Sequence, residues 1–246
     1  MMLAMIRIEP ALVVALSPHG EHAVVGRFLS ADQGLVAAYV QGGRGRKLRA
    51  VLQLGNRVAL DLVSKSPQQL AFATVHPLAA NLALMHGPAA LALVDYLASL
   101  AAATLPEGEA QPHLFPLFDA LLGGAAAGAA ALDVGPALVR LELAVLAELG
   151  LGLDLASCAA TGTVHDLAYI SPKSRQAVCR GAGLPWAAKL LPLPGFLLGT
   201  GEADAAAITD GLALSGHFLA RDVLRDSAAA KRCWTARERL VTLLAR

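Results

Sequence analysis

Short apolar stretches separated by turn-forming residues mark the first 76 residues of the chain. Strands are predicted at Ala11–Leu16, Ala23–Leu29, Leu35–Gln41, Arg57–Val63 and Leu70–His76. Glycine-containing turns follow the first and second of these strands, and Ser64–Gln68, which contains Pro67, is predicted to turn the chain before the fifth. Five short strands at this spacing predict a small barrel, for which the five-stranded OB-fold is the economical choice.

After residue 78 the pattern changes to long stretches rich in alanine and leucine, which favour helices. Helices are predicted at Pro88–Ala103, Pro112–Leu122, Pro136–Leu149, Ala203–Leu224 and Thr235–Leu244. Pro136 suits a first helical turn, and Gly150 suits the position after a helix end. The low-complexity stretch Ala120–Leu132 is compatible with either a loose loop or a poorly specified helix.

These patterns predict an α+β protein with two parts. An OB-fold barrel at residues 1–78 is followed by a mostly α-helical domain at residues 79–246, with an irregular segment near residues 151–183. The chain of 246 residues is long enough for one large domain or two modest ones.

Composition raises the question of membrane insertion, because 56% of the residues are hydrophobic and the mean hydropathy is +0.55. The most membrane-like stretch, Pro88–Pro106, contains Asp95 and consists mostly of Ala and Leu, so we expect a buried or amphipathic core helix instead. The segment MMLAMIRIEP lacks the features of a signal peptide, and three cysteines without paired spacing suit a reducing compartment. A cytoplasmic location is therefore expected.

The net charge of +1 hides an uneven distribution. Residues 1–80 and 171–246 carry net charges of +4 and +5, whereas residues 81–170 carry −8. Two basic ends around an acidic middle indicate different partners for different parts of the chain, although a chance fluctuation on a solvated surface is the alternative.

The segment YVQGGRGRKLRAVLQLG, residues 39–55, contains four cations within six residues: Arg44, Arg46, Lys47 and Arg49. Cations on a loop beside an OB barrel are well placed to follow a phosphate backbone, which gives affinity without sequence preference. Arg27 and Arg57 are predicted to extend this DNA-binding patch from neighbouring strands. The alternative is a solvated loop whose charges only aid solubility.

Stacking of bases normally uses aromatic side chains, and these make up only 4% of the chain. In the predicted barrel the candidates are Phe28, Tyr39 and Phe72, each of which is also a candidate core residue. This composition favours contact with the DNA backbone over base stacking.

Motifs of common enzyme classes are missing, among them the phosphate-binding loop, the nucleophile elbow and the HExxH metal pair. Cys158 and Cys179 are the candidates for a zinc site, but the positions three residues after them hold Thr161 and Ala182. Thr and Ala cannot supply thiolates, and a mixed site completed by His165 and Asp166 has no familiar spacing. We therefore expect packed free thiols, with neither a metal nor another cofactor.

The order of motifs resembles the RecO family of recombination-mediator proteins. The barrel pattern with Gly20-Glu21, Phe28, Gly34, Gly42 and Leu52-Gln53 is similar to that family's N-terminal OB domain. RLELAVLAELG (residues 140–150), LDLASCAATG (residues 153–162) and ARERL (residues 236–240) resemble its central helix, the segment after it and its closing helix. The resemblance covers most of the chain and rests on the order and spacing of motifs that are weak individually.

This resemblance implies a non-enzymatic role in DNA repair by homologous recombination, and with it a nucleoid-associated location. Members of the family bind single- and double-stranded DNA, anneal complementary strands, and with RecR help to load RecA onto strands coated by single-strand-binding protein. They also bind the acidic C-terminal tail of that protein. Many carry a four-cysteine zinc site where this chain has Cys158 and Cys179, so the metal is expected to be lost here.

Arg140 is the sole cation among residues 81–170, and its position in the resemblance makes it the candidate for capturing a carboxylate of that tail. Arg221 and Arg225 are further candidates, with added DNA surface as their alternative role. The alternative for Arg140 is a surface pair with Glu142, Asp133 or another local acid. Two rival functions stay open at this point: an RNA-binding OB protein, and an enzyme with an accessory OB domain. No membrane partner is expected.

Overall fold

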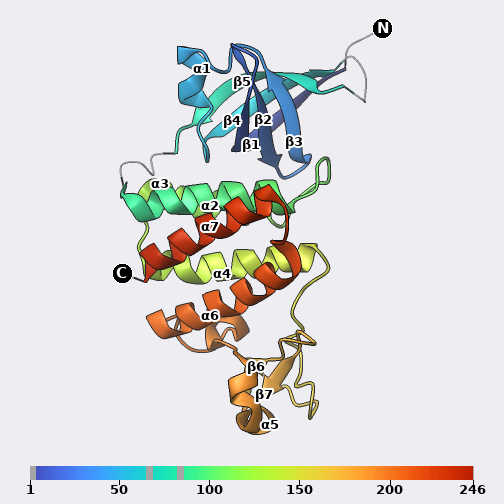
Figure 1. Cartoon of the computed structure of the whole chain (residues 1–246), viewed down its shortest axis with the longest axis vertical. Helices are drawn as coiled ribbons and strands as arrows, with labels where there is room; N and C mark the ends of the chain where they lie inside the picture. Colours follow the sequence, from blue (N-terminus) through green and yellow to red (C-terminus); the bar gives the residue numbers. More distant parts are fainter. Residues whose placement is uncertain (1–3, 65–68, 82–85, 246) are drawn as a thin grey trace. The chain divides into compact units, whose positions relative to one another are not determined.

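Five strands close into a barrel in the computed structural model, which describes residues 4–64, 69–81 and 86–245 (Figure 1). The strands are β1 (Ala4–His19), β2 (Ala23–Ser30), β3 (Gly34–Val40), β4 (Arg57–Ser64) and β5 (Ala71–Ala79). They follow one another around the barrel in the order β1-β2-β3-β5-β4, and β1 also pairs with β4. All pairs are antiparallel except β3 with β5. The predicted α+β architecture with an N-terminal OB-like barrel is confirmed.

Strand β1 begins seven residues before the expected Ala11, because Ala4–Ile8 pair with the second half of β4. This long strand pairs with both β4 and β2. Its register shifts between Ile8 and Ala11 in the pairing with β4, and between Val13 and Ala15 in the pairing with β2. Such irregularities bend a strand and increase its twist, which a small closed barrel requires. The turn predicted at Ser64–Gln68 falls on residues 65–68, which lie outside the described residues.

The barrel interior is filled by side chains that alternate along the strands. Val58, Leu60 and Leu62 of β4 are buried, as the period of two requires. Phe28 of β2 has no exposed surface and belongs to the same hydrophobic core. One of the three aromatic candidates is thus a core residue.

The chain divides by contacts into two compact units, and their limits differ from the boundary expected at residue 78. The first unit comprises residues 1–128 and 228–240, and so joins the barrel to α2 (Pro88–Thr104), α3 (Phe115–Ala127) and most of α7 (Ala228–Leu244). Helix α2 packs against β1 at one end of the barrel, and the short helix α1 (Arg46–Val51) lies at the other end (Figure 1). Helices bury one end of the barrel, which explains why the first unit is larger than residues 1–78. Independent folding of residues 1–78 stays a prediction.

The connection between α2 and α3 is held against the turn between β2 and β3. The backbone N–H of Gly108 donates to Leu35 O at 3.0 Å, and that of Gln111 donates to Ala31 O at 2.7 Å. Gly34 occupies the left-handed region with φ +61°, and a Cβ there would lie 1.7 Å from the carbonyl oxygen of Glu109. Only glycine allows this approach of two backbones.

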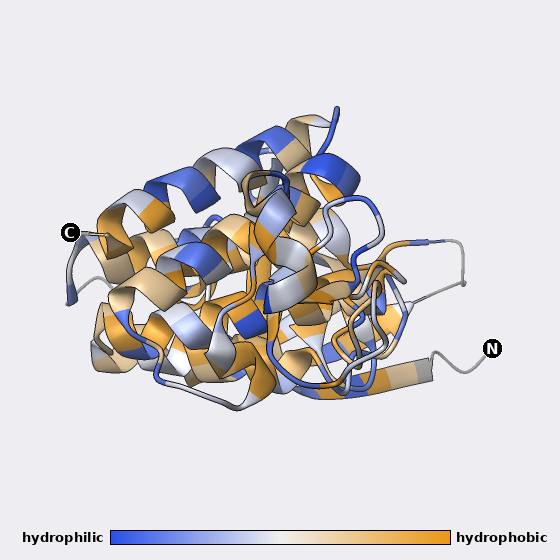
Figure 2. Cartoon of the chain, turned by 90° about the horizontal axis from the view of Figure 1, so that it is seen from below, coloured by the Kyte–Doolittle hydropathy of each residue, from blue (hydrophilic) through white to orange (hydrophobic). Residues whose placement is uncertain are grey.

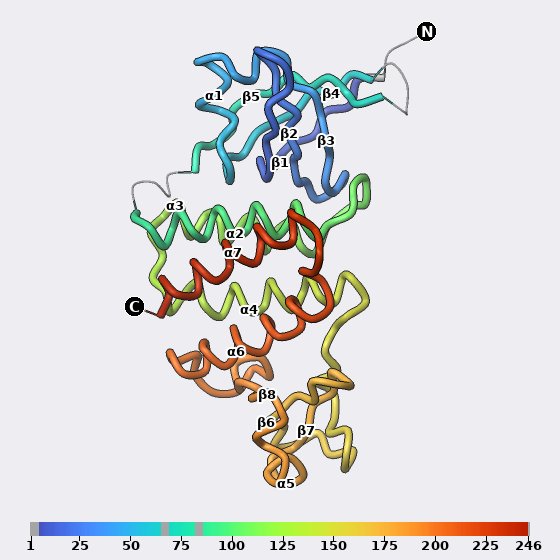
Figure 3. Tube along the Cα trace, viewed as in Figure 1, coloured from blue at the N-terminus to red at the C-terminus, as the bar shows by residue number. Residues whose placement is uncertain are grey.

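The second unit comprises residues 129–227 and 241–246, and α4 (Ala131–Glu148) packs against α6 (Ala205–Phe218) within it. Its other elements are a sheet of order β7-β6-β8 (Ala177–Cys179, Leu167–Ile170, Leu191–Pro192), the short helices α5 (Arg180–Gly183), η2 (Leu184–Lys189) and η3 (Gly195–Leu198), and the π-helix η4 (Leu219–Val223). Figure 3 traces the chain through these elements. The three-stranded sheet was not foreseen in the stretch predicted to be irregular.

Several helix limits correct the predictions. Helix α4 begins at Ala131, so Pro136 lies inside it and not in its first turn, whereas Gly150 does adopt the left-handed conformation after its end, with φ +73°. The stretch predicted as one helix over Ala203–Leu224 changes at Leu219 from α6 into the π-helix η4. The low-complexity stretch after Ala120 continues α3 as far as Ala127, where the left-handed Gly128 ends it.

Among the described residues, no helix is long and apolar enough to cross a membrane. Helix α2, the stretch examined for this property, buries Leu93, Tyr96, Leu97 and Leu100 in the protein core. Figure 2 shows hydrophobic and hydrophilic positions interspersed along the helices, as expected for helices that pack on one side.

Candidate nucleic-acid interface

The basic segment, defined here as residues 44–49, was predicted to be a loop and is largely helical. Arg46, Lys47 and Arg49 lie on helix α1, for which Gly45 is the extended N-cap residue. Leu48 and Val51, on the same helix, pack against the barrel core. Arg and Lys are good helix formers, and these apolar contacts hold one side of so short a helix on the barrel. The cations are therefore presented from an ordered element.

All four cations of the basic segment are exposed, and none forms an ion pair with an acid among the described residues. Arg44 is the best anchored of the four. Its guanidinium Nη1 donates to Gly20 O at 3.0 Å, and its backbone N–H donates to His22 O at 3.1 Å. These bonds place the basic segment beside the turn that joins β1 to β2.

A groove of about 390 Å³ lies between strands β1 and β2 on one side and α1 with its flanking residues on the other. Leu16 and Val24 contribute its apolar wall from β1 and β2, and Leu52 contributes from the chain after α1. Arg44 and Arg49 also line the groove, so a positive charge borders an apolar floor. An anion with an apolar portion fits this combination of surfaces.

Arg27 and Arg57 are not part of this groove. Both contact residues of the helices, or of the connection between α2 and α3, in the first unit. The Arg27 guanidinium donates to Ala102 O at 2.6 Å through Nη1, and its Nη2 lies 3.2 Å from Glu107 Oε1. Arg57 Nε donates to Asp119 Oδ1 of α3 at 2.5 Å. These contacts give both residues a role in fixing the helices to the barrel. Their predicted contact with DNA stays untested.

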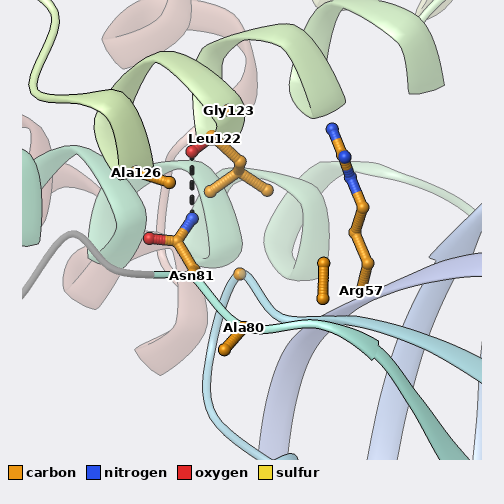
Figure 4. A pocket seen from close by; sticks show the side chains of 8 residues that line it. Arg57, Ala80, Asn81, Leu122, Gly123 and Ala126 are labelled. Atoms are coloured by element: carbon orange, nitrogen blue, oxygen red, sulfur yellow. Dashed lines mark hydrogen bonds between the residues drawn. The ribbon is translucent and has the colours of Figure 1, made fainter.

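Figure 4 shows the surroundings of Arg57, where a small cavity of about 60 Å³ opens between the barrel and α3. Asn81 points across it, and its Nδ2 donates to Leu122 O at 3.0 Å. Asn56 Oδ1 accepts from the backbone N–H of Asn81 at 2.7 Å. The cavity is too small for a nucleotide and belongs to the packing of the first unit.

The three candidates for binding an acidic tail differ in their availability. Arg140 on α4 donates from Nη2 to Phe196 O at 3.1 Å and stacks over the Phe196 ring at 5.3 Å, and it remains exposed. The pairing with Glu142 that was considered as an alternative is not seen, because the Glu142 carboxylate is buried and accepts from Ser215 Oγ at 2.5 Å. Arg140 thus keeps an exposed guanidinium on an aromatic ring.

Each guanidinium nitrogen of Arg221 in η4 donates a hydrogen bond, whereas Arg225 is exposed. Arg221 Nε and Nη2 donate to the two carboxylate oxygens of Asp222 at 2.8 and 2.7 Å, and Nη1 donates to Pro172 O. Arg175 Nη2 also donates to Asp222 Oδ2, at 2.9 Å. The Arg221 guanidinium, as the largest cause, lowers the pKa of Asp222 to about 2. Arg225 Nε donates to the Arg221 carbonyl oxygen. This cluster is a structural ion-pair network.

The four positions of a would-be zinc site do come together, although two of them lack thiols. Cys158 and Cys179 share one cluster with Ala182, and the Thr161 hydroxyl lies 3.6 Å from Cys179 Sγ. The backbone N–H of Cys179 donates to Cys158 Sγ at 3.2 Å, which lowers the pKa of the Cys158 thiol to about 6.

A tetrahedral zinc site needs four donors, and this cluster offers two thiols and one hydroxyl, so its residues do not fit zinc. Asp166, considered as a further ligand, is paired with Arg180 at 3.2 Å. Among the described residues, no group of three or more His, Cys, Asp or Glu side chains is arranged to hold a metal ion. Packing and hydrogen bonds connect Cys158 and Cys179 in this part of the fold.

Two aromatic residues that sequence reasoning left as core candidates are on the surface. Phe72 is 49% exposed and Tyr39 is partly exposed, and their ring centroids lie 5.2 Å apart. His19 contacts the Tyr39 ring at 5.6 Å. Strand parity could have indicated this, because Tyr39 precedes the buried Val40. The scarcity of aromatic residues therefore does not exclude base stacking.

Comparison with known proteins places these features in a family. Residues 85–229 match the family described as "Recombination protein O C terminal". The chain is 43% identical over 221 residues to the DNA repair protein RecO of Acidiphilium cryptum, with 87% of this chain and 86% of the relative covered. It is 42% identical over 234 residues to the protein of that name from Paracoccus denitrificans, covering 95% and 94%, and 39% identical over 241 residues to that from Cereibacter sphaeroides, covering 97% and 98%.

Proposed function

Because this chain belongs to the RecO family of DNA repair and recombination proteins, we propose that it is a non-enzymatic mediator that binds single- and double-stranded DNA and anneals complementary strands. In this proposal the basic segment is the primary DNA contact. The observation that carries it is the exposure of Arg44, Arg46, Lys47 and Arg49 without an acidic partner among the described residues.

The physical argument follows from what annealing requires. Two strands repel one another through their phosphates, and cations held between them lower that repulsion. Contacts to phosphates carry no sequence information, so the bases stay free to find their complements. Because Leu48 and Val51 hold α1 on the barrel, the backbone that carries its cations is in place before DNA arrives. Less backbone freedom is then lost on binding.

The acidic tail of single-strand-binding protein is the proposed partner of the second unit. Arg140 is the favoured residue, since its guanidinium is exposed and lies on the Phe196 ring, where an apolar side chain and a carboxylate could bind together. Arg225 is a secondary candidate. Arg221 is less available because Asp222 already neutralises it. RecR is proposed as a further partner, with loading of RecA as the joint outcome.

The test is a fluorescence-anisotropy titration of labelled DNA across a salt series, together with an annealing assay. The test variant changes Arg44, Arg46, Lys47 and Arg49 to Ala. The control variant removes the same charge from four other exposed cations: Lys173, Lys189, Lys231 and Arg239.

On single strands, each phosphate contact contributes about −0.7 to the slope of log affinity against log salt. Loss of four contacts should flatten the slope by up to about 3, and annealing should slow in parallel. Equal salt slopes in the wild type and the test variant would show that the basic segment is not the DNA site. Tighter binding of a matched RNA than of DNA would favour the rival function.

A further inference from the structure

An apolar row crosses the outer surface of the barrel on all five strands. Met5 of β1 pairs with Val63 of β4, Val63 with Phe72 of β5, Phe72 with Tyr39 of β3, and Tyr39 with Val25 of β2. Met5 is 68% and Phe72 is 49% exposed. Side chains that point outward from a barrel are normally polar, because the inward-pointing side chains already form the hydrophobic core.

The centre of this row is aromatic and ordered by ring contacts. The Tyr39 and Phe72 rings meet at an interplanar angle of 67°, and the His19 and Tyr39 rings meet at 83°. Edge contacts of this type hold the rings in place. Phe72 nevertheless retains half of its surface for another partner. Bound rings with free surface are what a stacking platform for bases requires.

The basic segment contacts the chain beside His19 and the strand that carries Phe72. Gly20, whose carbonyl oxygen accepts from Arg44 at 3.0 Å, directly follows His19 in the chain. Helix α1 packs against β5, the strand that carries Phe72. Glu21 is the neighbouring acid in the turn; its side chain points into solvent and lies 3.8 Å from His22. A strand whose phosphates follow the cations would therefore bring its bases to the rings.

We propose that His19, Tyr39 and Phe72 form a base-stacking platform, defined as the aromatic platform, that makes the barrel prefer single-stranded over double-stranded nucleic acid. The inference rests on the proposed DNA-binding function and specifies its ligand. Only a single strand can turn base faces towards a protein surface, since in a duplex those faces are stacked on one another. The neighbouring positive charge favours a polyanion over a second copy of this chain as the occupant.

The experiment compares three ligands of equal length: an ordinary single strand, an abasic single strand and a duplex. Phe72→Ala removes the most exposed ring, and Phe72→Leu keeps an apolar side chain without a ring. Leu117→Ala, which truncates an exposed leucine on α3, is the control. Phe72→Trp supplies a second readout, because a stacked base quenches indole fluorescence beyond any change of the native tryptophans.

Phe72→Ala and Phe72→Leu should weaken binding of the ordinary strand about tenfold. Both should bind the abasic strand and the duplex as the wild type does, with an unchanged salt slope. Phe72→Trp should bind normally and be quenched by the ordinary strand only. Leu117→Ala should behave as the wild type.

Wild-type affinity of both Phe72 variants for the ordinary strand would overturn the platform and leave the proposed function standing. Equal quenching of Phe72→Trp by ordinary and abasic strands would also overturn it. Self-association that Phe72→Ala abolishes without changing DNA affinity would identify the row as a contact between copies. Failure of the wild type to bind any of the three ligands would overturn the proposed function itself.

Discussion

The ion-pair network around Asp222 allows a quantitative prediction about the second unit. The substitution Asp222→Asn preserves the shape of the side chain and removes the charge that accepts from Arg221 and Arg175 at 2.7–2.9 Å. The pKa of Asp222 falls from 3.8 to about 2 on folding. At about 1.4 kcal/mol per pKa unit, the charged carboxylate contributes about 2 kcal/mol to the free energy of unfolding. The network lies near the surface, where solvent screening weakens such interactions, so this value is an upper bound.

The sign of the pH dependence follows from the lowered pKa. The contribution is fully present above the unfolded pKa of 3.8, because the carboxylate is then ionised in both states. It is lost as the pH falls from about 5 to about 2, where the folded carboxylate also takes up a proton. The gap in unfolding free energy between the wild type and Asp222→Asn should therefore shrink by about 2 kcal/mol over this range.

Denaturant unfolding followed by Trp186 fluorescence measures this gap for the second unit. The background substitution Trp234→Phe removes the tryptophan that belongs to the first unit. Asp226→Asn, which neutralises a nearby exposed acid, should produce a gap of less than about 0.5 kcal/mol at every pH. A gap for Asp222→Asn that stays constant between pH 6 and pH 2.5 would refute the linkage argument.

Three further predictions concern particular residues. Gly34→Ala should destabilise the first unit far more than Gly20→Ala in thermal unfolding. Both glycines have φ near +60°, but only at Gly34 would a Cβ meet backbone atoms. Similar losses of thermal stability in the two variants would exclude the clash. Phe28→Ala should lower the unfolding free energy by about 3–5 kcal/mol, because it empties a fully buried position, and a loss under 1 kcal/mol would contradict that burial. Ultraviolet titration of the Cys158 thiolate should show a midpoint near pH 6, because the Cys179 N–H stabilises the charged sulfur. The substitution Cys158→Ser should remove this transition. A midpoint in the ordinary thiol range would contradict the hydrogen bond.

Local pattern was sufficient for the strands of the barrel. Val58, Leu60 and Leu62 recur with the period of two that a strand requires, and the intervening Asp61 and Val63 are partly exposed. The limits of β4 were accordingly found within one residue. The early start of β1 was missed, because residues 4–10 become a strand only through pairing with β4, more than fifty residues away. Local propensity does not contain that partner.

The cations likewise divide into those whose environment the local sequence predicted and those whose environment depends on distant residues. The composition of residues 44–49 made them a candidate interface, and their exposure leaves that prediction intact. Arg27 and Arg57 looked equivalent in the sequence. Their partners Glu107 and Asp119 are 80 and 62 residues away in the chain, and only packing of the helices on the barrel brings them within 3.2 and 2.5 Å. An ion pair between distant residues leaves no local signal.

The aromatic platform required tertiary structure for a different reason. His19, Tyr39 and Phe72 come from three strands, and their ring contacts depend on the register of β3 against β5. A shift by one residue would turn Phe72 into the barrel and leave the rings apart. No stretch of sequence encodes that register by itself.

Alternation, glycine turns and charge clustering therefore determined by themselves that this chain has an OB-like barrel, a helical remainder and a basic segment, since each arises from residues close together in the chain. The tertiary structure alone decided which arginines are neutralised, which aromatic rings face solvent and how two thiols pack together. Those outcomes depend on contacts between residues far apart in sequence, and such contacts exist only after the strands have closed and the helices have packed.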